Sequence, residues 1–178
     1  MTDYLVSKWK IWYKSLDVNH DGIISIEDVE ESRNKFTDLH KLVGDKSTGV
    51  KVDMQKWWDT YIFLTPGAEI SETQFVENLG NSFKKDKKAF LATMTACFNM
   101  IFDVIDTNKD RSIDLNEFIY AFAAFGHENE SVVRTAFALL KPDDNNTVPL
   151  RTVVDAWISF VTCEDASKTD VIKSAFES

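Results

Sequence analysis

The chain has 178 residues, of which 44% are apolar and 28% charged, and its formal net charge is −9 at pH 7. This apolar fraction is too large for a disordered chain, and the length suits one compact domain or two small lobes that share a core. The negative charge argues against nucleic acid and anionic membranes as partners, and it is the balance expected of a protein that binds cations.

The sequence predicts neither a membrane span nor a secretory signal. No run of apolar residues reaches about 18 positions, and the N-terminal stretch, MTDYLVSKWK, lacks a long apolar segment. We therefore expect a cytosolic protein. Its cysteines, Cys97 and Cys163, form no metal-type pair, and we expect both to be reduced packing thiols.

A helical pattern and a first metal-type loop open the chain. Apolar residues recur at helical spacing over residues 3–16, with Thr2 or Asp3 as the N-cap. Residues 17–28 then read DVNHDGIISIED. A twelve-residue calcium loop supplies oxygens from positions one, three, five, seven, nine and twelve. The candidate ligands here are Asp17, Asn19, Asp21, the Ile23 carbonyl, Ser25 and Asp28.

The closing residue of this first loop is Asp28, where glutamate is usual. Aspartate is one methylene shorter and reaches an ion less readily with both oxygens, and a site with fewer oxygens is closer to the octahedral geometry of Mg²⁺. Gly22 fills position six, where the chain turns with positive φ. We therefore expect the first loop to bind Ca²⁺ or Mg²⁺, with His20 pointing to solvent.

The second helix–loop–helix pattern keeps its apolar frame but loses its ligands. An exiting helix is expected over residues 27–34, and helical spacing resumes near Val50 and again after a loop at residues 63–74. Positions one, three and five of that loop hold Phe63, Thr65 and Gly67. These residues supply no carboxylate, so the sequence predicts an inactive loop.

The third loop carries the strongest metal signal in the chain. Residues 106–117 read DTNKDRSIDLNE and lie between two helical patterns. Its candidate ligands are Asp106, Asn108, Asp110, the Ser112 carbonyl, Asp114 (directly or through water) and Glu117. Position six is Arg111, where glycine is usual, and a positive φ at a residue other than glycine costs roughly 1–2 kcal/mol.

The fourth loop, residues 141–152, is expected to be inactive. Lys141 places a cation at position one, and Thr152 cannot replace the closing carboxylate, although Asp143 and Asn145 remain at positions three and five. The chain after residue 163 has an amphipathic pattern and is expected to dock on the body.

The spacing predicts an all-α fold of four helix–loop–helix units in two paired lobes within one globule. The expected divisions are residues 1–85, residues 86–163 and the tail, residues 164–178. Loops that form a pair can join by a short antiparallel pairing at position eight, so we expect Ile24 opposite Ile70 and Ile113 opposite Val148. Each active loop would then lie beside an inactive one that holds it in shape.

These four units and the two loops DVNHDGIISIED and DTNKDRSIDLNE resemble the invertebrate sarcoplasmic calcium-binding proteins of the EF-hand superfamily, in particular the molluscan muscle members. The resemblance covers almost the whole chain. It implies a cytosolic buffer of muscle that binds Ca²⁺ and often Mg²⁺, and several members of the family act as allergens. Carried over to the first and third loops, it implies two bound Ca²⁺ ions.

Other functions stay open on the sequence alone. One alternative is a Ca²⁺ sensor that grips a target helix, but four methionines against 13 phenylalanines and five tryptophans favour a closed core. Another is a relative of the photoproteins that binds a coelenterazine-type luciferin. We find no nucleophile–base arrangement, phosphate loop or catalytic metal motif, so an enzyme is not expected. Nor is an obligatory protein partner expected, and a monomer or weak dimer fits.

Overall fold

The computed structural model is mainly helical and describes residues 1–63, 65 and 67–177. Two three-residue strands are the other regular elements among these residues. In chain order the elements are α1 (Asp3–Leu16), α2 (Ile26–Leu39), α3 (Gly44–Trp57), the π-helical turn η1 (Trp58–Ile62), α4 (Glu72–Lys85), α5 (Lys87–Ile105), β1 (Ser112–Asp114), α6 (Leu115–Ala124), α7 (Glu130–Leu139), β2 (Thr147–Pro149), α8 (Leu150–Thr162) and α9 (Val171–Glu177).

Side chains at the helix starts explain where several helices begin. Thr2 caps α1 by accepting from the amide of Leu5, as the sequence predicted. Ser25 and Ser71 open α2 and α4 with capping boxes, in which the residue three positions on returns a bond to the cap amide. These bonds satisfy amides that the first helical turn leaves without partners.

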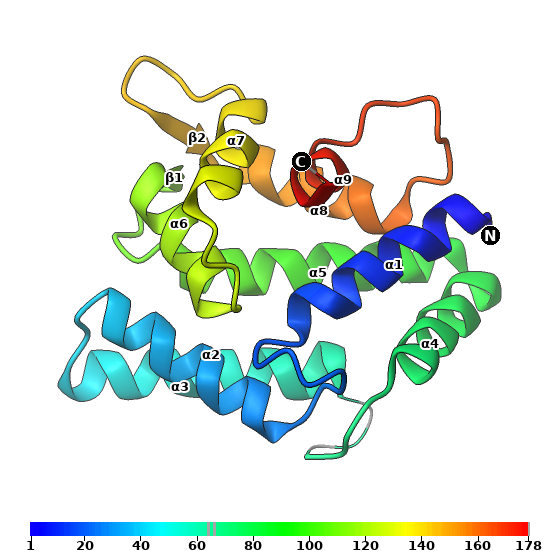
Figure 1. Ribbon diagram of the computed structural model, residues 1–178, viewed down its shortest axis with the longest axis horizontal. Coiled ribbons are helices and arrows are strands. Elements are labelled where there is room, and N and C mark those ends of the chain that lie inside the picture. The colour runs from blue at the N-terminus through cyan, green and yellow to red at the C-terminus, as the bar shows by residue number, and fades with distance from the viewer. Residues whose placement is uncertain (64, 66, 178) are drawn as a thin grey trace.

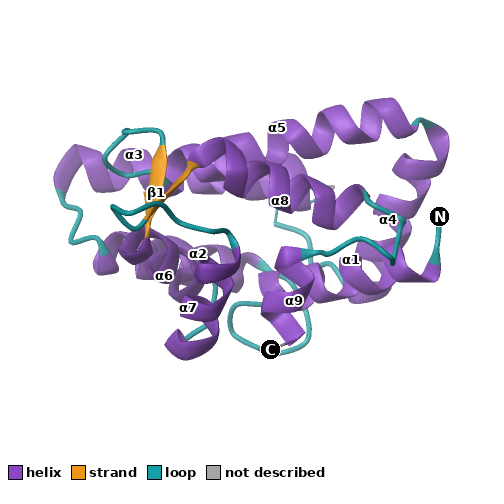
Figure 2. Ribbon diagram, turned by 90° about the horizontal axis from the view of Figure 1, so that it is seen from above, coloured by secondary structure: helices purple, strands orange, loops and turns teal. Residues whose placement is uncertain are grey.

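Helix α5 crosses the middle of the view in Figure 1 and packs on α3, α4, α6 and α8. Helices α2 and α3 lie on one side of it, and α6, α7 and α8 on the other. Helix α2 packs on α6, and α1 packs on α4, α8 and α9, so the two halves of the chain share one body. The two strands lie together at one end (Figure 2).

Both expected loop pairings are present. Ile113 faces Val148 in the antiparallel pair of β1 and β2. An isolated antiparallel bridge joins Ile24 and Ile70, with each amide donating to the other carbonyl at 3.1 and 2.9 Å. All four side chains are buried, which places each pairing inside the core and not at its edge.

Aromatic rings fill much of that core. The tryptophans of α1, Trp9 and Trp12, and the neighbouring Trp57 and Trp58 are all buried, as the sequence predicted. Trp12 and Phe98 lie 5.4 Å apart between ring centres and join α1 to α5. Such pairs add stabilisation beyond the area they bury.

Three sequence expectations need correction. Helix α3 begins at Gly44 and not near Val50, and α2 runs to Leu39, beyond the expected end at residue 34. Both extensions follow from packing of α2 on α3, which overrides weak local propensity. Helix α5 is also long and apolar enough to span a membrane, although no such run was expected. Its inward face is part of the core, and core helices of this length meet the same criterion.

Candidate metal centres

The first loop draws its candidate ligands together through its own backbone. The two oxygens of Asp17 accept from the amides of Asp21 and Gly22, at 3.2 and 2.9 Å. Asn19 and Asp21 lie side by side, with 3.2 Å from the amide nitrogen to the carboxylate. Asp28 closes the ring, because it accepts from the amides of Asn19 and Ser25 at 3.1 and 2.8 Å.

The third loop repeats this pattern. Asp106 Oδ2 accepts from the amide of Arg111 at 3.1 Å, and Asn108 Nδ2 donates to Asp110 Oδ2 at 3.1 Å. Glu117 Oε2 accepts from the amide of Asp114 at 3.1 Å, and Glu117 Oε1 from that of Thr107 at the same distance. The closing carboxylate therefore lies against the first turn of the loop.

Position nine has a second task in both loops. Asp114 Oδ1 accepts from the amide of Glu117 at 2.8 Å and forms a capping box that starts α6. Ser25 accepts from the amide of Glu27 and starts α2 in the same way. Each side chain is thus already used as a helix cap, and this role was not anticipated. The bond also fixes the closing carboxylate relative to the helix that follows.

The third loop contains an oxygen that fits a cation. Asp106 is fully buried, and its Oδ1 has no hydrogen-bond partner among the described residues. A buried carboxylate oxygen without a partner is costly. A cation at the centre of the loop would satisfy it, so the donor set fits the hard cation that the spacing indicates.

Burial also affects the two closing carboxylates. Burial raises the pKa of Glu117 above its ordinary value, and the nearby charges of Asp114 and Asp106 raise it further, although two donated hydrogen bonds oppose them. Burial likewise raises the pKa of Asp28, against bonds from backbone amides. Both residues sit where a carboxylate is disfavoured unless positive charge is close.

Carboxylates alone do not make up these centres. Within the part of the chain that the structure describes, no three His, Cys, Asp or Glu side chains converge closely enough to hold a metal. The expected sites instead combine carboxylates with Asn amides and with the carbonyls of Ile23 and Ser112, as hard cations accept. In both loops, hydrogen bonds from backbone amides hold the acidic side chains in place.

The fourth loop lacks such an arrangement. In the fourth loop, Asp143 is exposed and its Oδ1 accepts from the amides of Asn145 and Thr147, both at 3.0 Å. Lys141 adopts φ +57° at position one. The expected second loop includes residues 64 and 66, which lie outside the described residues, so its geometry as a whole is not assigned.

The first loop is also held by the far half of the chain. His20 is exposed, as expected, but its Nε2 lies 3.1 Å from the carbonyl of Gly126 at the corner between α6 and α7. A Cβ on Gly126 would lie 2.5 Å from the carbonyl oxygen of Val18, and its φ is +88°. Only glycine suits this close approach of the corner to the loop.

The chain is similar in sequence to known calcium-binding proteins. A family model described as an EF-hand domain pair matches residues 7–123. A sarcoplasmic calcium-binding protein from Mizuhopecten yessoensis is 98% identical over 177 residues, which cover 99% of this chain and 100% of that protein. The chain belongs to the sarcoplasmic calcium-binding proteins of the EF-hand superfamily. Membership supports a calcium-binding role, and this is not a family of enzymes.

One further relative and one similar solved structure come from species of Renilla. A luciferin-binding protein from Renilla reniformis is 31% identical over 123 residues, which cover 69% of this chain and 66% of that protein. The structure of the coelenterazine-binding protein from Renilla muelleri, in its calcium-loaded apo form, aligns with a TM-score of 0.81 and 24% identity. The alignment covers 99% of this chain and 98% of that one. The structural likeness confirms the all-α EF-hand fold.

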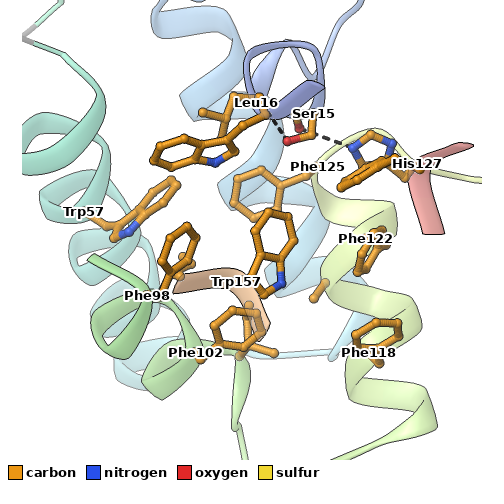
Figure 3. Close-up of a pocket in the computed structure, with 15 residues that line it drawn as sticks. Ser15, Leu16, Trp57, Phe98, Phe102, Phe118, Phe122, Phe125, His127 and Trp157 are labelled. Carbon is orange, nitrogen blue, oxygen red and sulfur yellow. Dashed lines mark hydrogen bonds between the residues drawn. The ribbon is translucent and has the colours of Figure 1, made fainter. Parts of the chain in front are cut away.

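An apolar cavity lies between α1, α3, α5, α6, α8 and α9. Space of about 70 Å³ is open there to the centre of a water molecule. The lining comprises Trp12, Ser15, Leu16, Trp57, Phe98, Ile101, Phe102, Ile105, Phe118, Ala121, Phe122, Phe125, His127, Trp157 and Phe176. Figure 3 shows these side chains converging from several helices, with Trp157 among the rings.

Sequence reasoning missed this cavity. Its lining extends from α1 to α9, and its apolar members read locally as ordinary core residues. His127 lies in the loop between α6 and α7, and its Nε2 is 3.3 Å from the carbonyl of Ser15 (Figure 3). Burial lowers the pKa of this imidazole, against the opposing effect of that carbonyl. The spacing along the chain carries no signal for such a site.

Proposed function

We propose that this protein is a calcium buffer of the cytoplasm in muscle, with two working sites at residues 17–28 and 106–117. The observation that carries the proposal is the buried Asp106 oxygen without a partner, opposite a closing Glu117 that is itself buried. Family membership supports the calcium-binding part of the proposal. Muscle and sarcoplasm come from the name of the Mizuhopecten relative.

The proposed ligands divide by role. The side chains at positions one, three and five, which are Asp, Asn and Asp in both loops, lie on the entering side of each loop, and Asp28 or Glu117 closes it from the helix that follows. The Ile23 and Ser112 carbonyls would add oxygens, and Ser25 and Asp114 would act from their helix-cap positions, directly or through water. A bound Ca²⁺ supplies positive charge and needs no further chemistry from the chain.

The closing residue provides a reciprocal test of ion preference. Asp28→Glu should raise the preference of the first site for Ca²⁺ over Mg²⁺, because the longer side chain reaches the ion with two oxygens. Glu117→Asp should lower that preference at the third site. Calorimetric Ca²⁺ titrations with and without millimolar Mg²⁺ measure both effects. If Mg²⁺ competes equally at both sites in all three proteins, the closing residue does not set the preference.

A closed core supports a buffer over a sensor. Sensors open a flexible, methionine-rich groove when calcium binds. Here Met54 and Met94 are buried, and the interior is packed with stiff aromatic side chains. Fluorescence of a hydrophobic dye distinguishes the two functions. A buffer should show no increase in dye binding when Ca²⁺ is added, whereas a large increase would indicate a sensor.

A second candidate function is carriage of a small aromatic molecule. The Renilla reniformis relative is named for luciferin binding, and the interior cavity is the observation that favours a related role here. An apolar cavity with few polar groups is the usual form of a small-molecule site. Binding of an aromatic ligand to the calcium-loaded protein, measured by calorimetry, tests this candidate.

A further inference from the structure

We propose that the hydroxyl of Thr107, at position two of the third loop, limits how strongly this site prefers Ca²⁺ over Mg²⁺. The inference rests on the proposed function and names a residue outside the ligand set that regulates the third site. The evidence is the set of hydrogen bonds to the closing carboxylate, the burial of that carboxylate, and the different residue at position two of the first loop.

The closing carboxylate of the third loop accepts hydrogen bonds on both of its oxygens. Glu117 Oε1 accepts from the backbone amide of Thr107 at 3.1 Å and from the side-chain hydroxyl of the same residue at 3.2 Å. Glu117 Oε2 accepts from the amide of Asp114 at 3.1 Å. A carboxylate has about four lone pairs, two on each oxygen. The described residues therefore use both lone pairs of Oε1 and leave one on Oε2.

The two ions need different numbers of these lone pairs. Ca²⁺ takes about six to eight oxygens and binds the closing glutamate of such a loop through both carboxylate oxygens. Mg²⁺ requires octahedral geometry and is bound through fewer carboxylate oxygens. With the side chains as they lie here, Oε2 is open to a cation, which suits Mg²⁺. Binding of Ca²⁺ by both oxygens of Glu117 requires one donor at Oε1 to withdraw.

The hydroxyl is the donor that can withdraw. The amide of Thr107 is fixed by the backbone at the start of the loop, whereas a hydroxyl hydrogen rotates about its C–O bond. Turning it away loses one hydrogen bond to a charged group, and such bonds are the stronger kind. Glu117 is buried, with 4% of its surface exposed, so water does not readily replace the lost donor. Binding of Ca²⁺ therefore carries a cost that binding of Mg²⁺ avoids.

The first loop has no such hydroxyl. Its position two is Val18, whose side chain carries no hydrogen-bond donor. Among the described residues, the donors to Asp28 are backbone amides, including those of Asn19 and Ser25 at 3.1 and 2.8 Å. The cost that the Thr107 hydroxyl imposes on Ca²⁺ therefore arises at the third site and not at the first.

The test measures the third site alone. Every protein in the series carries Asp28→Asn, which removes the closing carboxylate of the first loop, and Ca²⁺ and Mg²⁺ are titrated separately by calorimetry. Thr107→Val keeps the shape of the side chain and removes the hydroxyl. It should tighten Ca²⁺ binding about three- to tenfold, as release from one hydrogen bond predicts, and change Mg²⁺ binding by less than about twofold.

Three further variants are the controls. Thr107→Ala removes the hydroxyl with a smaller side chain and should act as Thr107→Val does, so the result does not depend on the packing of one variant. Thr107→Ser keeps the hydroxyl and should retain both affinities. Thr95→Val removes a hydroxyl bond on α5, to the carbonyl of Leu91, and should leave both affinities unchanged.

The outcomes separate this inference from the proposed function. If Thr107 only supports the fold of the loop, its loss should weaken binding of both ions. Equal changes for the two ions, or a Ca²⁺ affinity that stays the same or falls in Thr107→Val, would overturn the inference while the third site stands. If the Asp28→Asn protein binds no Ca²⁺, the third site is absent and both the inference and the proposed function are overturned.

Discussion

At the scale of single residues, Arg111 is the strained position of the third loop. It adopts φ +64°, as the sequence predicted, and its amide donates to the buried Asp106. The matching position in the first loop is Gly22, with φ +88°. The two loops thus make the same turn with very different residues at position six. Glycine can be placed in the third loop, and a larger residue in the first, to measure what this difference costs.

Replacing Arg111 with glycine should stabilise the third loop. The left-handed backbone conformation costs arginine roughly 1–2 kcal/mol in the folded state. Glycine removes this cost, but it also raises the conformational entropy of the unfolded chain, which offsets about 0.5–1 kcal/mol of the gain. We expect a net gain of up to about 1 kcal/mol in the free energy of unfolding, measured by urea denaturation of the metal-free protein.

Gly22→Ala is the matched control for this prediction. A Cβ at Gly22 would have no heavy atom within 4 Å, so its effect comes from the backbone alone and should lower the free energy of unfolding by about 1 kcal/mol. The account of the turn is wrong if Arg111→Gly destabilises the protein as much as Gly22→Ala does.

The sequence could predict which side chains come together in each loop, because that depends on spacing within one loop. Backbone bonds do draw Asp17, Asn19, Asp21 and Asp28 together in the structure. The sequence could not predict that one oxygen of Asp106 lacks a hydrogen-bond partner, or that Asp28 and Glu117 accept hydrogen bonds from backbone amides. Such partners depend on side-chain geometry. The metal roles of these residues therefore stay predictions.

At the scale of elements, the pairing of loops was predictable and the helix ends were less so. A fixed offset within a repeated unit placed Ile113 opposite Val148, and the strands β1 and β2 pair there. Helix α3 instead begins at Gly44, because contacts with α2 decide its length. Local propensity is a weak guide where packing between elements dominates.

Replacing Val148 with aspartate should weaken Ca²⁺ binding at residues 106–117, although Val148 is not a proposed ligand. The new carboxylate would lie in a fully buried position opposite Ile113, where an unpaired charge is strongly disfavoured. We expect the strands to separate and the third site to lose at least about tenfold in affinity, or about 1.4 kcal/mol.

Val148→Ala is the control, because it keeps the backbone pairing and removes only apolar volume. It should lower the free energy of unfolding by an amount typical of a small cavity, about 1–3 kcal/mol, with a smaller change in affinity. Calorimetry of both variants gives the comparison. Unchanged Ca²⁺ affinity in Val148→Asp would refute the supporting role of the inactive loop.

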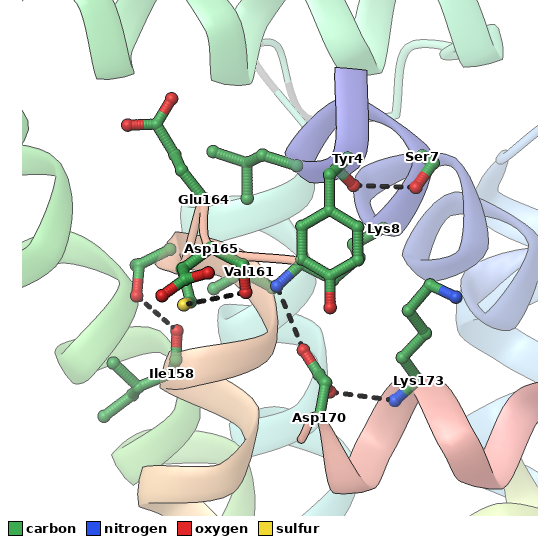
Figure 4. A network of polar contacts seen from close by, with 12 residues as sticks. Tyr4, Ser7, Lys8, Ile158, Val161, Glu164, Asp165, Asp170 and Lys173 are labelled. Carbon is green, nitrogen blue, oxygen red and sulfur yellow. Dashed lines mark hydrogen bonds and ion pairs between the residues drawn. The ribbon is translucent and has the colours of Figure 1, made fainter. Parts of the chain in front are cut away.

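At the scale of the whole molecule, the two ends of the chain close the fold. Lys8 on α1 has no exposed side-chain area, and its ammonium pairs with Asp170 before α9 at 3.0 Å. The same carboxylate accepts from the amide of Lys173 at 2.9 Å. Figure 4 shows these bonds linking the two segments. The sequence predicted docking of the tail from its apolar pattern, but not this ion pair.

Asp170→Asn should destabilise the protein strongly. The change leaves the buried ammonium of Lys8 without its counter-charge, and breaking a buried pair from one side costs about 3–5 kcal/mol. For a chain of this length, the midpoint of thermal unfolding should fall by at least about 6 °C, measured by circular dichroism.

The matched control is Glu130→Gln, which breaks the exposed pair of Glu130 with Arg134. Exposed pairs contribute little, so this midpoint should stay within about 2 °C of the unmodified protein. The double variant Lys8→Met with Asp170→Asn removes both charges and should recover part of the loss. Equal midpoints for Asp170→Asn and Glu130→Gln would show that the buried pair does not hold the ends together.

The central claim is that two of the four loops bind calcium. The geometry of residues 17–28 and 106–117 supports it, as do Lys141 at position one of the fourth loop and the absence of carboxylates at Phe63, Thr65 and Gly67 of the second. Native mass spectrometry of the protein with Ca²⁺ counts bound ions directly. We expect two ions at saturation, and one in Glu117→Gln. A third ion would contradict the account by showing that another loop is active, and a single ion would contradict the first site.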